Sequence, residues 1–540
     1  MTMSQADFLA DALNCGNALI GKASLSQLQS VRNDAWSAFC QTLLTPAEIG
    51  SPELKKYTER LRDIDRIYSA SLVYASAQPA ERRKALAMYF TPPYLSEYVL
   101  DRLERFGVDF GTGRFIDPSA GGASFIGPIA SRMRTNGATP KQVLASLTGI
   151  EIDPALAEFA RVAATCVIEQ DASEVVVTGN GLELGELGTY DAVIGNPPYR
   201  VLSQAERKCM PIWAKETLGT YANLYALFIM RGLQLLKDGG VLALLVPTSF
   251  IAGQYFKRLR HHLTSQSRVL AIDTISQRKK MFRDVSQDVC LLICRKGASK
   301  RGVFRADARI VNQGMKWHKQ DRYLIESPSE KPWCAVPPVG KNSTLQTLED
   351  LGYQVRCGSI VHNRDKGLFS GVRRKRRSAV PLVWGHVIKP GHNVEPASRR
   401  CQPGEGPVTF ASTLGRAEPI TCSSIVLQRT NSGDQVRRIR AGIVDQSWID
   451  KYGGFYGENH VVIISPLPEI NPKICLRLLW RLLSSEAVDK RLRPLLSSNS
   501  INIAALRMLP IPNFRYLAQQ DIMDVSDAAF EAILVKAYSS

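Results

Sequence analysis

An amide, two prolines and a tyrosine, Asn196-Pro197-Pro198-Tyr199, directly follow the mainly apolar stretch 191–195 (DAVIG). Proline fixes the φ angle and lacks an N–H group, so the pair forms a stiff arm that neither a helix nor a central strand can use. The Asn196 side-chain oxygen and the Pro197 carbonyl are two acceptors at a fixed separation, which suits both hydrogens of an NH₂ group. Tyr199 can stack on the ring that bears this group. The stretch predicts a site for a planar amine, and a rigid turn is the alternative.

The chemistry explains the need for two acceptors. An exocyclic amino nitrogen on adenine is a poor nucleophile because its lone pair is spread into the ring. Two hydrogen bonds at the NH₂ group would favour a pyramidal nitrogen with a localised lone pair. No general base is required before attack, since the proton is lost after the nitrogen has become positive. A neighbouring sulfonium would deliver a methyl group in line, and positioning would supply most of the rate.

A second candidate site lies upstream, in the segment 115–125 (FIDPSAGGASF), which has the pattern of a strand, a loop of small residues and a helix start. Such a loop lets the backbone approach a ligand without Cβ clashes, and it directs helix N–H groups toward that ligand. It lacks the Gly-Lys-Ser/Thr ending of a P-loop and the GxGxxG dinucleotide pattern. An acidic residue at the strand end suits a cationic amino-acid group. The candidate ligand-binding residues here are Asp117, Pro118, Ala120 and Gly121.

The next two predicted strands also end in residues that suit a nucleoside. Glu151 can accept hydrogen bonds from both hydroxyls of a ribose, and Ile152 beside it offers an apolar face to a base. Asn180, followed by Gly181, can bond an adenine edge through its amide. Each signal is weak alone, because a Gly-rich turn is more often structural. Their order on consecutive strands favours a nucleotide-like cofactor.

Alternating strands and helices are predicted to position these residues. Strand patterns occur in 113–121, 146–154, 174–180, 190–198, 239–249, 269–275 and 288–296, with helical patterns in 123–137, 154–167 and 223–240. This alternation predicts an α/β fold with a mainly parallel, doubly wound, Rossmann-like sheet, which binds ligands at the carboxyl ends of its strands. We expect three domains: a helical extension (1–80), a catalytic domain (81–300) and an α+β domain (301–540).

Together these motifs resemble the gamma-group DNA adenine-N6 methyltransferases of type II restriction–modification systems, which are TaqI/Eco57I-like class I enzymes. The resemblance covers roughly residues 85–300, in the order cofactor loop, NPPY and C-terminal target-recognition domain. The stretch 89–103 (YFTPPYLSEYVLDRL) matches a further cofactor element of that family, carried by Thr91 and Pro92. A proline at the first turn of a helix is the simpler explanation of this stretch, and both can hold.

The resemblance implies S-adenosyl-L-methionine as cofactor and a site without metal. It implies that Asp117 and the Gly121 loop hold the methionine part, Glu151 the ribose and Asn180 the cofactor adenine. Thr91, Pro92, Pro118, Ala120, Ile152, Gly181 and Asn196 complete the expected cofactor site. The expected target-base site is Asn196, Pro197, Pro198 and Tyr199, with Phe282 as a second aromatic wall unless it is a core residue.

The sequence departs from the family pattern at two positions. Ala123 stands where the loop usually has its second glycine, and Asn180 stands where the family usually has aspartate. A neutral amide is a weaker acceptor than a carboxylate, so the contact to the cofactor adenine would be weaker or differently oriented. Neither change would abolish the reaction.

The charge distribution points to a polyanionic partner. The chain has 68 Lys and Arg against 50 Asp and Glu; residues 1–300 hold 34 and 29 of these, and residues 301–540 hold 34 and 21. The excess therefore lies in the C-terminal part, where double-stranded DNA would bind, although a charge run is usually only a solvated face. The stretches 454–464 and 500–514 resemble elements of recognition domains. The candidate DNA-binding residues are Arg373, Arg374, Lys375, Arg376, Arg377, Arg429, Arg437 and Arg438.

Other functions stay open at this point. An RNA or protein-glutamine N-methyltransferase also fits an NPPY arm, and a non-catalytic DNA-binding subunit could retain the fold. A fused nuclease is a further possibility, since 51–56 (SPELKK) has nuclease-like spacing but no upstream Asp in a strand context. A cognate restriction endonuclease encoded separately would be the functional partner. The scattered cysteines, and the lack of a signal peptide or an apolar run of about 18 residues, predict a cytoplasmic protein without a membrane span.

Overall fold

The computed structural model describes residues 61–539 with internal gaps, and it forms two compact units. The described ranges are 61–86, 88–219, 222–275, 289–297, 303–311, 322–328, 333, 345–361, 369–370, 379–389, 392–395, 410–413, 418–430, 437–492, 500–501, 503–512 and 519–539. The first unit comprises Met1–Phe250 and Gln254–Lys331, and the second comprises Ile251–Gly253 and Pro332–Ser540.

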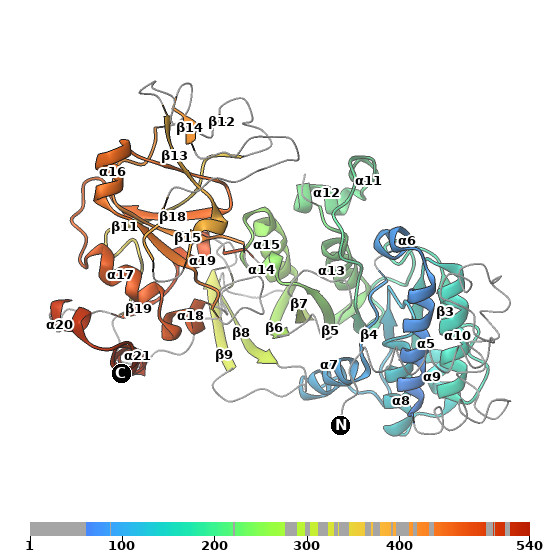
Figure 1. Ribbon diagram of the computed structural model, residues 1–540. Coiled ribbons are helices and arrows are strands. Elements are labelled where there is room, and N and C mark those ends of the chain that lie inside the picture. The colour runs from blue at the N-terminus through green and yellow to red at the C-terminus, as the bar shows by residue number, and fades with distance from the viewer. Residues whose placement is uncertain are drawn as a thin grey trace. The chain divides into compact units, whose positions relative to one another are not determined.

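A nine-stranded sheet forms the centre of the first unit, in the order β3-β2-β1-β4-β5-β7-β6-β8-β9 (Figure 1). The strands β3 to β5 in this order are all parallel, β7 runs antiparallel between β5 and β6, and β8 is again parallel to β6. This confirms the predicted α/β class with a mainly parallel sheet. The strands are β1 Phe115–Asp117, β2 Leu147–Glu151, β3 Val176–Thr178, β4 Tyr190–Gly195, β5 Leu236–Pro247, β6 Ser267–Ile275, β7 Val289–Lys296, β8 Val303–Val311 and β9 Arg322–Pro328.

Helices cover both faces of this sheet because alternate strand residues point to opposite sides. On one face, Ala192, Ala243 and Leu291 share a buried core with helices α5, α7, α8 and α10. On the other face, Gly232 of α13 lies against Val193 and Leu242. The helices of this unit are α5 Asp63–Ala77, α6 Ala80–Ala85, α7 Pro93–Arg105, α8 Ile126–Thr135, α9 Pro140–Ser146, α10 Pro154–Ile168, α11 Gln204–Lys208, α12 Ile212–Leu218, α13 Leu224–Leu235 and α15 Lys257–Gln266; α14 Ser249–Ala252 crosses the boundary between the units.

Local sequence signals set where the helices near the strand ends begin. Asp153 directly follows β2 and caps α10, because its side chain accepts hydrogen bonds from two backbone N–H groups of the first turn. Prolines occupy the first position of α7 (Pro93) and of α10 (Pro154), where the missing N–H costs nothing. The strand-to-helix loops are therefore fixed at the same edge of the sheet.

A buried ionic cluster ties α7 to the distant strand β6. Asp273 is fully buried and accepts hydrogen bonds from Tyr98 (2.8 Å) and Arg102 (2.7 and 3.3 Å). Removing one partner of such a pair leaves an uncompensated buried charge and is strongly destabilising. The cluster thus fixes the position of the segment that leads into α7.

The second unit is built from small sheets and helices. Its sheets have the orders β11-β18-β15-β16, β12-β14-β13-β17 and β10-β19. The strands are β10 Leu345–Gln346, β11 Tyr353–Cys357, β12 Phe369–Ser370, β13 Ala379–Val383, β14 Phe410–Ser412, β15 Ser424–Gln428, β16 Ala441–Val444, β17 Tyr456–Gly457, β18 Val461–Pro466 and β19 Ile511–Pro512. The helices are α16 Gln446–Tyr452, α17 Leu476–Leu483, α18 Glu486–Leu492, α19 Ile503–Arg507, α20 Gln519–Asp524 and α21 Asp527–Ser539.

Amphipathic helices close the core of this unit. Leu478, Leu479, Leu482 and Leu483 of α17 are fully buried with strands β15 and β18. Among the described residues, no helix combines the length and the apolar character that a membrane crossing requires.

Candidate active site

A cavity of about 400 Å³ opens at the carboxyl ends of β1, β2, β3 and β4. This volume lies within the range that small-molecule and cofactor sites occupy. Residues from each of the predicted motifs line it: Thr91, Asp117, Pro118, Ala120, Gly121, Glu151, Ile152, Asn180, Gly181, Asn196 and Pro198. The structure therefore brings together side chains that are more than 100 positions apart in the sequence.

Asp117, at the end of β1, is a buried acceptor that faces this cavity. Its Oδ1 accepts hydrogen bonds from the backbone N–H (2.9 Å) and hydroxyl (3.3 Å) of Ser119. The described residues donate no hydrogen bond to its other oxygen, Oδ2. Burial raises the pKa of Asp117 to about 7, against the hydrogen bonds from Ser119, which lower it. A cationic ligand group would supply the missing partner.

The loop after β1 makes a tight turn whose backbone approaches its neighbours closely. Gly121 and Ala123 both adopt left-handed φ angles, 53° and 60°. Glycine takes this conformation freely, whereas a residue with a Cβ atom is strained in it. Ala123 therefore departs from the family pattern at a position where its conformation still demands the missing glycine. A Cβ at Gly122 would overlap the hydroxyl of Ser71 on α5, which donates a hydrogen bond to the Gly122 carbonyl (2.8 Å).

Glu151 ends β2 and holds this loop against the next one. Its two oxygens accept hydrogen bonds from the backbone N–H groups of Gly121 (2.8 Å) and Asp153 (2.9 Å). Burial raises the pKa of the Glu151 carboxyl. Each oxygen keeps a further lone pair for a ligand hydroxyl. Ile152 next to it is 59% exposed and lines the cavity, so it presents a bare apolar side chain there.

Asn180 and Gly181 line the cavity from the loop after β3, which lies against the loop after β1. The Asn180 side chain stabilises its own turn: its oxygen accepts from Leu182 N (3.1 Å) and its NH₂ donates to Glu183 (2.8 Å). A Cβ atom at Gly181 would overlap the carbonyl oxygen of Pro118, so the two loops can only meet at a glycine. Close approach of the loops after β1 and β3 thus shapes the cavity.

Asn196 leaves β4 with its amide held by the upstream element. Its Nδ2 donates to the carbonyl of Tyr89 and the hydroxyl of Thr91, both at 3.1 Å, and its Oδ1 accepts from the Tyr199 hydroxyl. Gly195 before it permits this approach, since a Cβ there would lie 2.6 Å from Asp117 Oδ1. Thr91, predicted as a cofactor residue, is therefore in direct contact with the NPPY arm.

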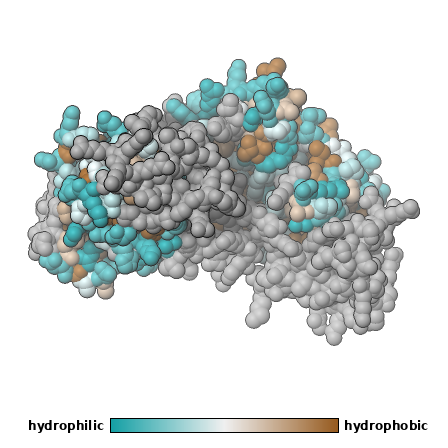
Figure 2. Space-filling model, turned by 45° about the horizontal axis from the view of Figure 1, so that its top comes forward, coloured by the Kyte–Doolittle hydropathy of each residue, from teal (hydrophilic) through white to brown (hydrophobic). Residues whose placement is uncertain are grey.

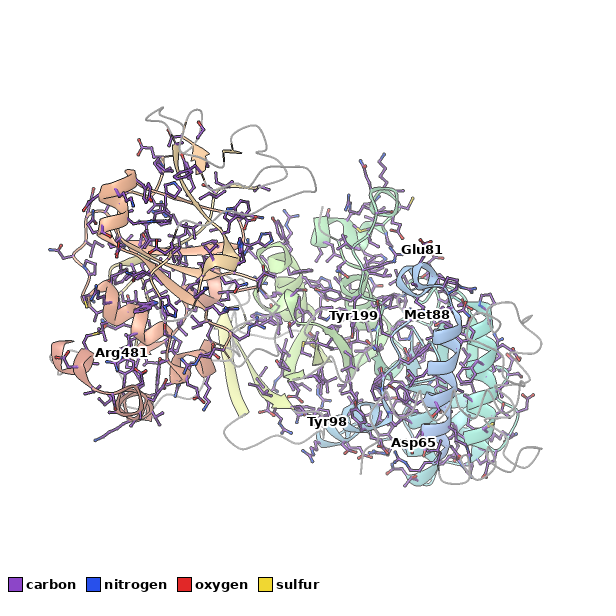
Figure 3. All side chains as sticks on the ribbon, viewed as in Figure 1. Asp65, Glu81, Met88, Tyr98, Tyr199 and Arg481 are labelled. Atoms are coloured by element: carbon purple, nitrogen blue, oxygen red, sulfur yellow. The ribbon has the colours of Figure 1, made fainter. Side chains whose placement is uncertain are left out.

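Tyr199 is anchored at its polar end and lies beside the sheet. The single hydroxyl hydrogen of Tyr199 is shared between Asn196 Oδ1 and the carbonyl of Leu245 on β5 (3.0 Å). Burial raises the pKa of this hydroxyl well above its usual value, so it stays a neutral donor. The ring itself is half-buried, and Figure 3 shows Tyr199 to the left of Met88. Among the described residues, the lining of the cavity does not include Tyr199, Pro92 or Pro197, and the Tyr199 ring packs against the core, so its stacking on a base stays a prediction.

Several lining residues were not predicted as site residues, although Phe90 lies in the matched stretch 89–103. Met88 and Phe90 line the cavity from the segment before Thr91, and Phe228 lines it from α13. Leu202, Met210 and Pro211 do so from the segment that follows the arm. In the sequence these are ordinary apolar residues, and only the aromatic pair in 88–91 (MYFT) beside Thr91 could have indicated a role. Figure 2 shows that apolar residues remain exposed in small groups among hydrophilic ones on the face that it presents.

The predicted DNA-binding residues have different environments. Arg429 donates to the carbonyl of Asn459 (2.9 Å), and Arg437 donates to the carbonyl of Ser484. Arg438 is only 3% exposed, so its side chain lies in the interior of the second unit. Phe282 and the run Arg373, Arg374, Lys375, Arg376 and Arg377 lie outside the described residues.

Comparison with known proteins finds relatives among restriction-modification methylases. The model of the Eco57I restriction-modification methylase matches residues 157–282. The type II methyltransferase M.BsuBI of Bacillus subtilis is 24% identical over 59% of this chain and 64% of its own length. M.PstI of Providencia stuartii is 24% identical over 63% of this chain and 67% of its own length. The chain thus spans about two thirds of the length of these two relatives.

A solved structure extends the likeness to nearly the whole chain. The Type IIL restriction-modification enzyme MmeI, solved in complex with DNA, superposes with a TM-score of 0.51 at 14% identity, over 98% of this chain and 90% of that one. This likeness establishes a shared fold. With these matches, residues 157–282 are similar to the Eco57I family of restriction-modification methylases, and the chain as a whole has relatives among type II methyltransferases.

Proposed function

We propose that this protein is a site-specific DNA methyltransferase of a type II restriction–modification system. It transfers a methyl group from S-adenosyl-L-methionine to N6 of an adenine swung out of a short duplex recognition sequence. The observation that carries the proposal is the orientation of the Asn196 amide, whose acceptor oxygen is fixed on a rigid arm beside the cavity.

The hydrogen bonds of Asn196 determine which end of the amide faces which partner. The carbonyl of Tyr89 can only accept, so the atom facing it must be the NH₂ group. Both of its hydrogens are then used, on Tyr89 and Thr91, and Oδ1 is left as the acceptor. One lone pair of Oδ1 receives the Tyr199 hydroxyl, and the second is available to a substrate N–H.

The neighbouring carbonyl supplies the second acceptor. Among the described residues, no donor bonds to the Pro197 oxygen, and the ring of Pro198 holds it in place. Two fixed acceptors select an NH₂ group over a ring nitrogen or a hydroxyl. They also stabilise the positive charge that the nitrogen acquires during attack, which is where preorganised polar groups contribute most.

The residues around the cavity fit S-adenosyl-L-methionine. Asp117 Oδ2 suits its ammonium group, Glu151 its ribose hydroxyls, and the exposed Ile152 its adenine face, with Asn180 at the edge. When bound, this cofactor supplies an electrophilic methyl group on sulfur. Gly181 and Gly121 have no side chains that would enter the cavity, so the loops after β1 and β3 leave room for a ligand of this length.

DNA is the favoured substrate among amine-bearing molecules. The relatives M.BsuBI and M.PstI are named type II methyltransferases, and residues 301–540 carry 34 basic against 21 acidic residues. A target base inside a duplex must be extruded at a cost of a few kcal/mol, and contacts to the phosphate backbone offset that cost. A protein-glutamine substrate would leave this charge without a role. An RNA substrate would use it as DNA does, and the kinship with restriction-modification methylases favours DNA over RNA. Protection of host DNA from a separately encoded endonuclease would be the biological purpose.

The direct test is to express the protein in a methylation-free host and map modified bases by single-molecule sequencing. We expect N6-methyladenine at one short sequence. Asn196→Ala should lower methyl transfer by at least about a hundredfold, the usual effect of removing a polar group aimed at developing charge. Binding of DNA and cofactor should change only a few-fold.

Asn136→Ala is a matched control, because this asparagine at the end of α8 is exposed and its side chain donates to Arg132 O and to Glu104 of α7, neither of which lines the cavity. It should methylate like wild type. Methylation of cytosine or of protein, or near wild-type activity of Asn196→Ala, would contradict the proposal.

A further inference from the structure

A turn in the second unit carries a histidine that a buried carboxylate holds in place. Glu458 is 3% exposed, and both its oxygens are used by one residue: Oε1 pairs with Nδ1 of the His460 ring (2.7 Å), and Oε2 accepts from the His460 backbone N–H (2.9 Å). The His460 side chain is 56% exposed. The other ring nitrogen, Nε2, is in none of the hydrogen bonds of the described residues.

This pair is not needed to fix the turn, because backbone contacts already do so. Glu458 N donates to Val383 O (3.0 Å), Asn459 N to Ile360 O (2.8 Å) and Val461 N to Glu458 O (2.8 Å). Burying a carboxylate is costly, and an apolar residue often stabilises a fold equally well. Glu458 is nevertheless buried, and its main contact is to the exposed His460 ring. This arrangement indicates that the ring is oriented toward a ligand.

The surroundings of His460 favour an anionic ligand with several oxygens. Arg429 N donates to His460 O (2.8 Å), and the Arg429 guanidinium braces the turn through Asn459 O (2.9 Å). The strand continues into Thr430, which is exposed and whose hydroxyl lies 3.4 Å from that of Ser500. An imidazole and hydroxyl groups are typical donors to DNA phosphates, whereas bases are mostly read by Arg, Asn and Gln.

We propose that the His460 turn is a phosphate anchor, at which Nε2–H donates to one backbone phosphate of the bound DNA. Glu458 accepts a hydrogen bond from the ring on the inside, and the phosphate accepts one on the outside. This inference rests on the proposed function, since it takes duplex DNA as the substrate. It assigns His460 to the position of the duplex and not to the reading of its sequence.

The test compares the DNA affinity of wild type and variant for a set of duplexes. Each duplex contains the methylated sequence found by sequencing, and one backbone phosphate is replaced by an uncharged methylphosphonate, at a different position in each duplex. We expect wild type to lose about tenfold in affinity at one phosphate, as for a hydrogen bond to a charged group. His460→Ala should bind all duplexes about tenfold more weakly and be insensitive to that same methylphosphonate. The methylated sequence should stay unchanged.

His392→Ala is the matched control, since His392 is an exposed histidine of the same unit without an acidic partner among the described residues. If His460→Ala lowers the melting temperature by more than a few degrees, His460→Asn replaces it, because its amide can still donate to Glu458. The proposal is wrong if His460→Ala stays as sensitive as wild type to every methylphosphonate. It is also wrong if His460→Ala methylates a different sequence. Absence of DNA methylation by wild type would instead refute the proposed function.

Discussion

At the scale of single residues, Asp117 links burial to ligand charge. Its pKa is raised to about 7 because the carboxyl is desolvated, so near neutral pH it holds a proton for part of the time. The protonated form cannot balance the ammonium group of S-adenosyl-L-methionine. Below pH 7, Asp117 must therefore lose its proton before the cofactor binds, which lowers the cofactor affinity. Above pH 7, Asp117 is already ionised, and the affinity does not depend on pH through this group.

The dissociation constant of the cofactor should rise by up to about tenfold for each pH unit below 7, the limit for one linked proton. Calorimetric titrations between pH 5.5 and 8.5 would measure this. Asp117→Asn should bind more weakly at pH 8 and show a flat profile. A steep profile that persists in Asp117→Asn would assign the titration to another group.

Gly181 matters because it has no side chain, which lets the loops after β1 and β3 meet. A Cβ atom there would overlap the Pro118 carbonyl, so Gly181→Ala must separate the loops after β1 and β3. We expect at least about a tenfold loss of cofactor affinity, since two walls of the cavity move. Gly188→Ala is the control, because its φ is 67° and its Cβ would meet open space. That variant should lose about 1 kcal/mol of stability from strain and keep its cofactor affinity.

At the scale of elements, periodicity alone predicted the part of the sheet that carries the site. Strands β1 to β4 and β7 and helices α8 and α13 lie within the predicted segments. Strands β5 and β6 begin three and two residues before theirs, α10 ends one residue later, and the helical pattern 223–240 runs into β5. Short apolar runs bounded by Gly, Pro and Asp are strong local signals. Strands β8 (VFRADARIV) and β9 (RYLIESP) were not predicted, because charged residues interrupt their apolar pattern.

The residues that buttress the cavity from outside could not be predicted in the same way. Thr91, Asp117, Glu151 and Asn196 carry chemistry in their side chains and follow recognisable strand or turn patterns. Ser71 on α5 is one polar residue in an otherwise plain helix, and its partner Gly122 is 51 positions away. Such a contact depends on how the helix docks, and neither composition nor spacing encodes it locally.

The contact between α5 and the cofactor loop gives a prediction for this element. Ser71→Ala removes the hydrogen bond to the Gly122 carbonyl and should raise the KM for the cofactor about two- to tenfold, the effect of one ordinary hydrogen bond. The kcat at saturating cofactor should stay nearly unchanged, because the NPPY arm is not touched.

Ser69→Ala is the matched control on the same helix, since the Ser69 hydroxyl donates to the Asp65 carbonyl within α5. Steady-state kinetics together with melting temperatures distinguish the two variants. Equal changes in KM for Ser71→Ala and Ser69→Ala would show that α5 acts only through general stability.

At the scale of the whole molecule, the candidate active site and the excess of basic residues lie in different parts of the chain. The cavity, the arm and the sheet belong to the first unit, whereas the excess of 34 basic over 21 acidic residues lies in 301–540. A methyl transferase for a small molecule would not need this asymmetry. Extruding a base requires a large favourable contact elsewhere on the duplex, and phosphate contacts supply it without sequence information.

The basic run Arg373–Arg377 is the strongest sequence candidate for part of that contact. Replacing its five cations by glutamine should weaken DNA binding at every sequence, because phosphate contacts carry no base information. If each cation neutralises one phosphate, the slope of log affinity against log salt should become shallower by about 4 to 5. Replacing the five exposed lysines Lys389, Lys451, Lys473, Lys490 and Lys536 by glutamine removes the same net charge elsewhere in the unit and should leave most of the slope. An unchanged slope for the five-residue variant would relocate the phosphate contacts to other parts of the second unit, with the His460 turn as the next element to examine.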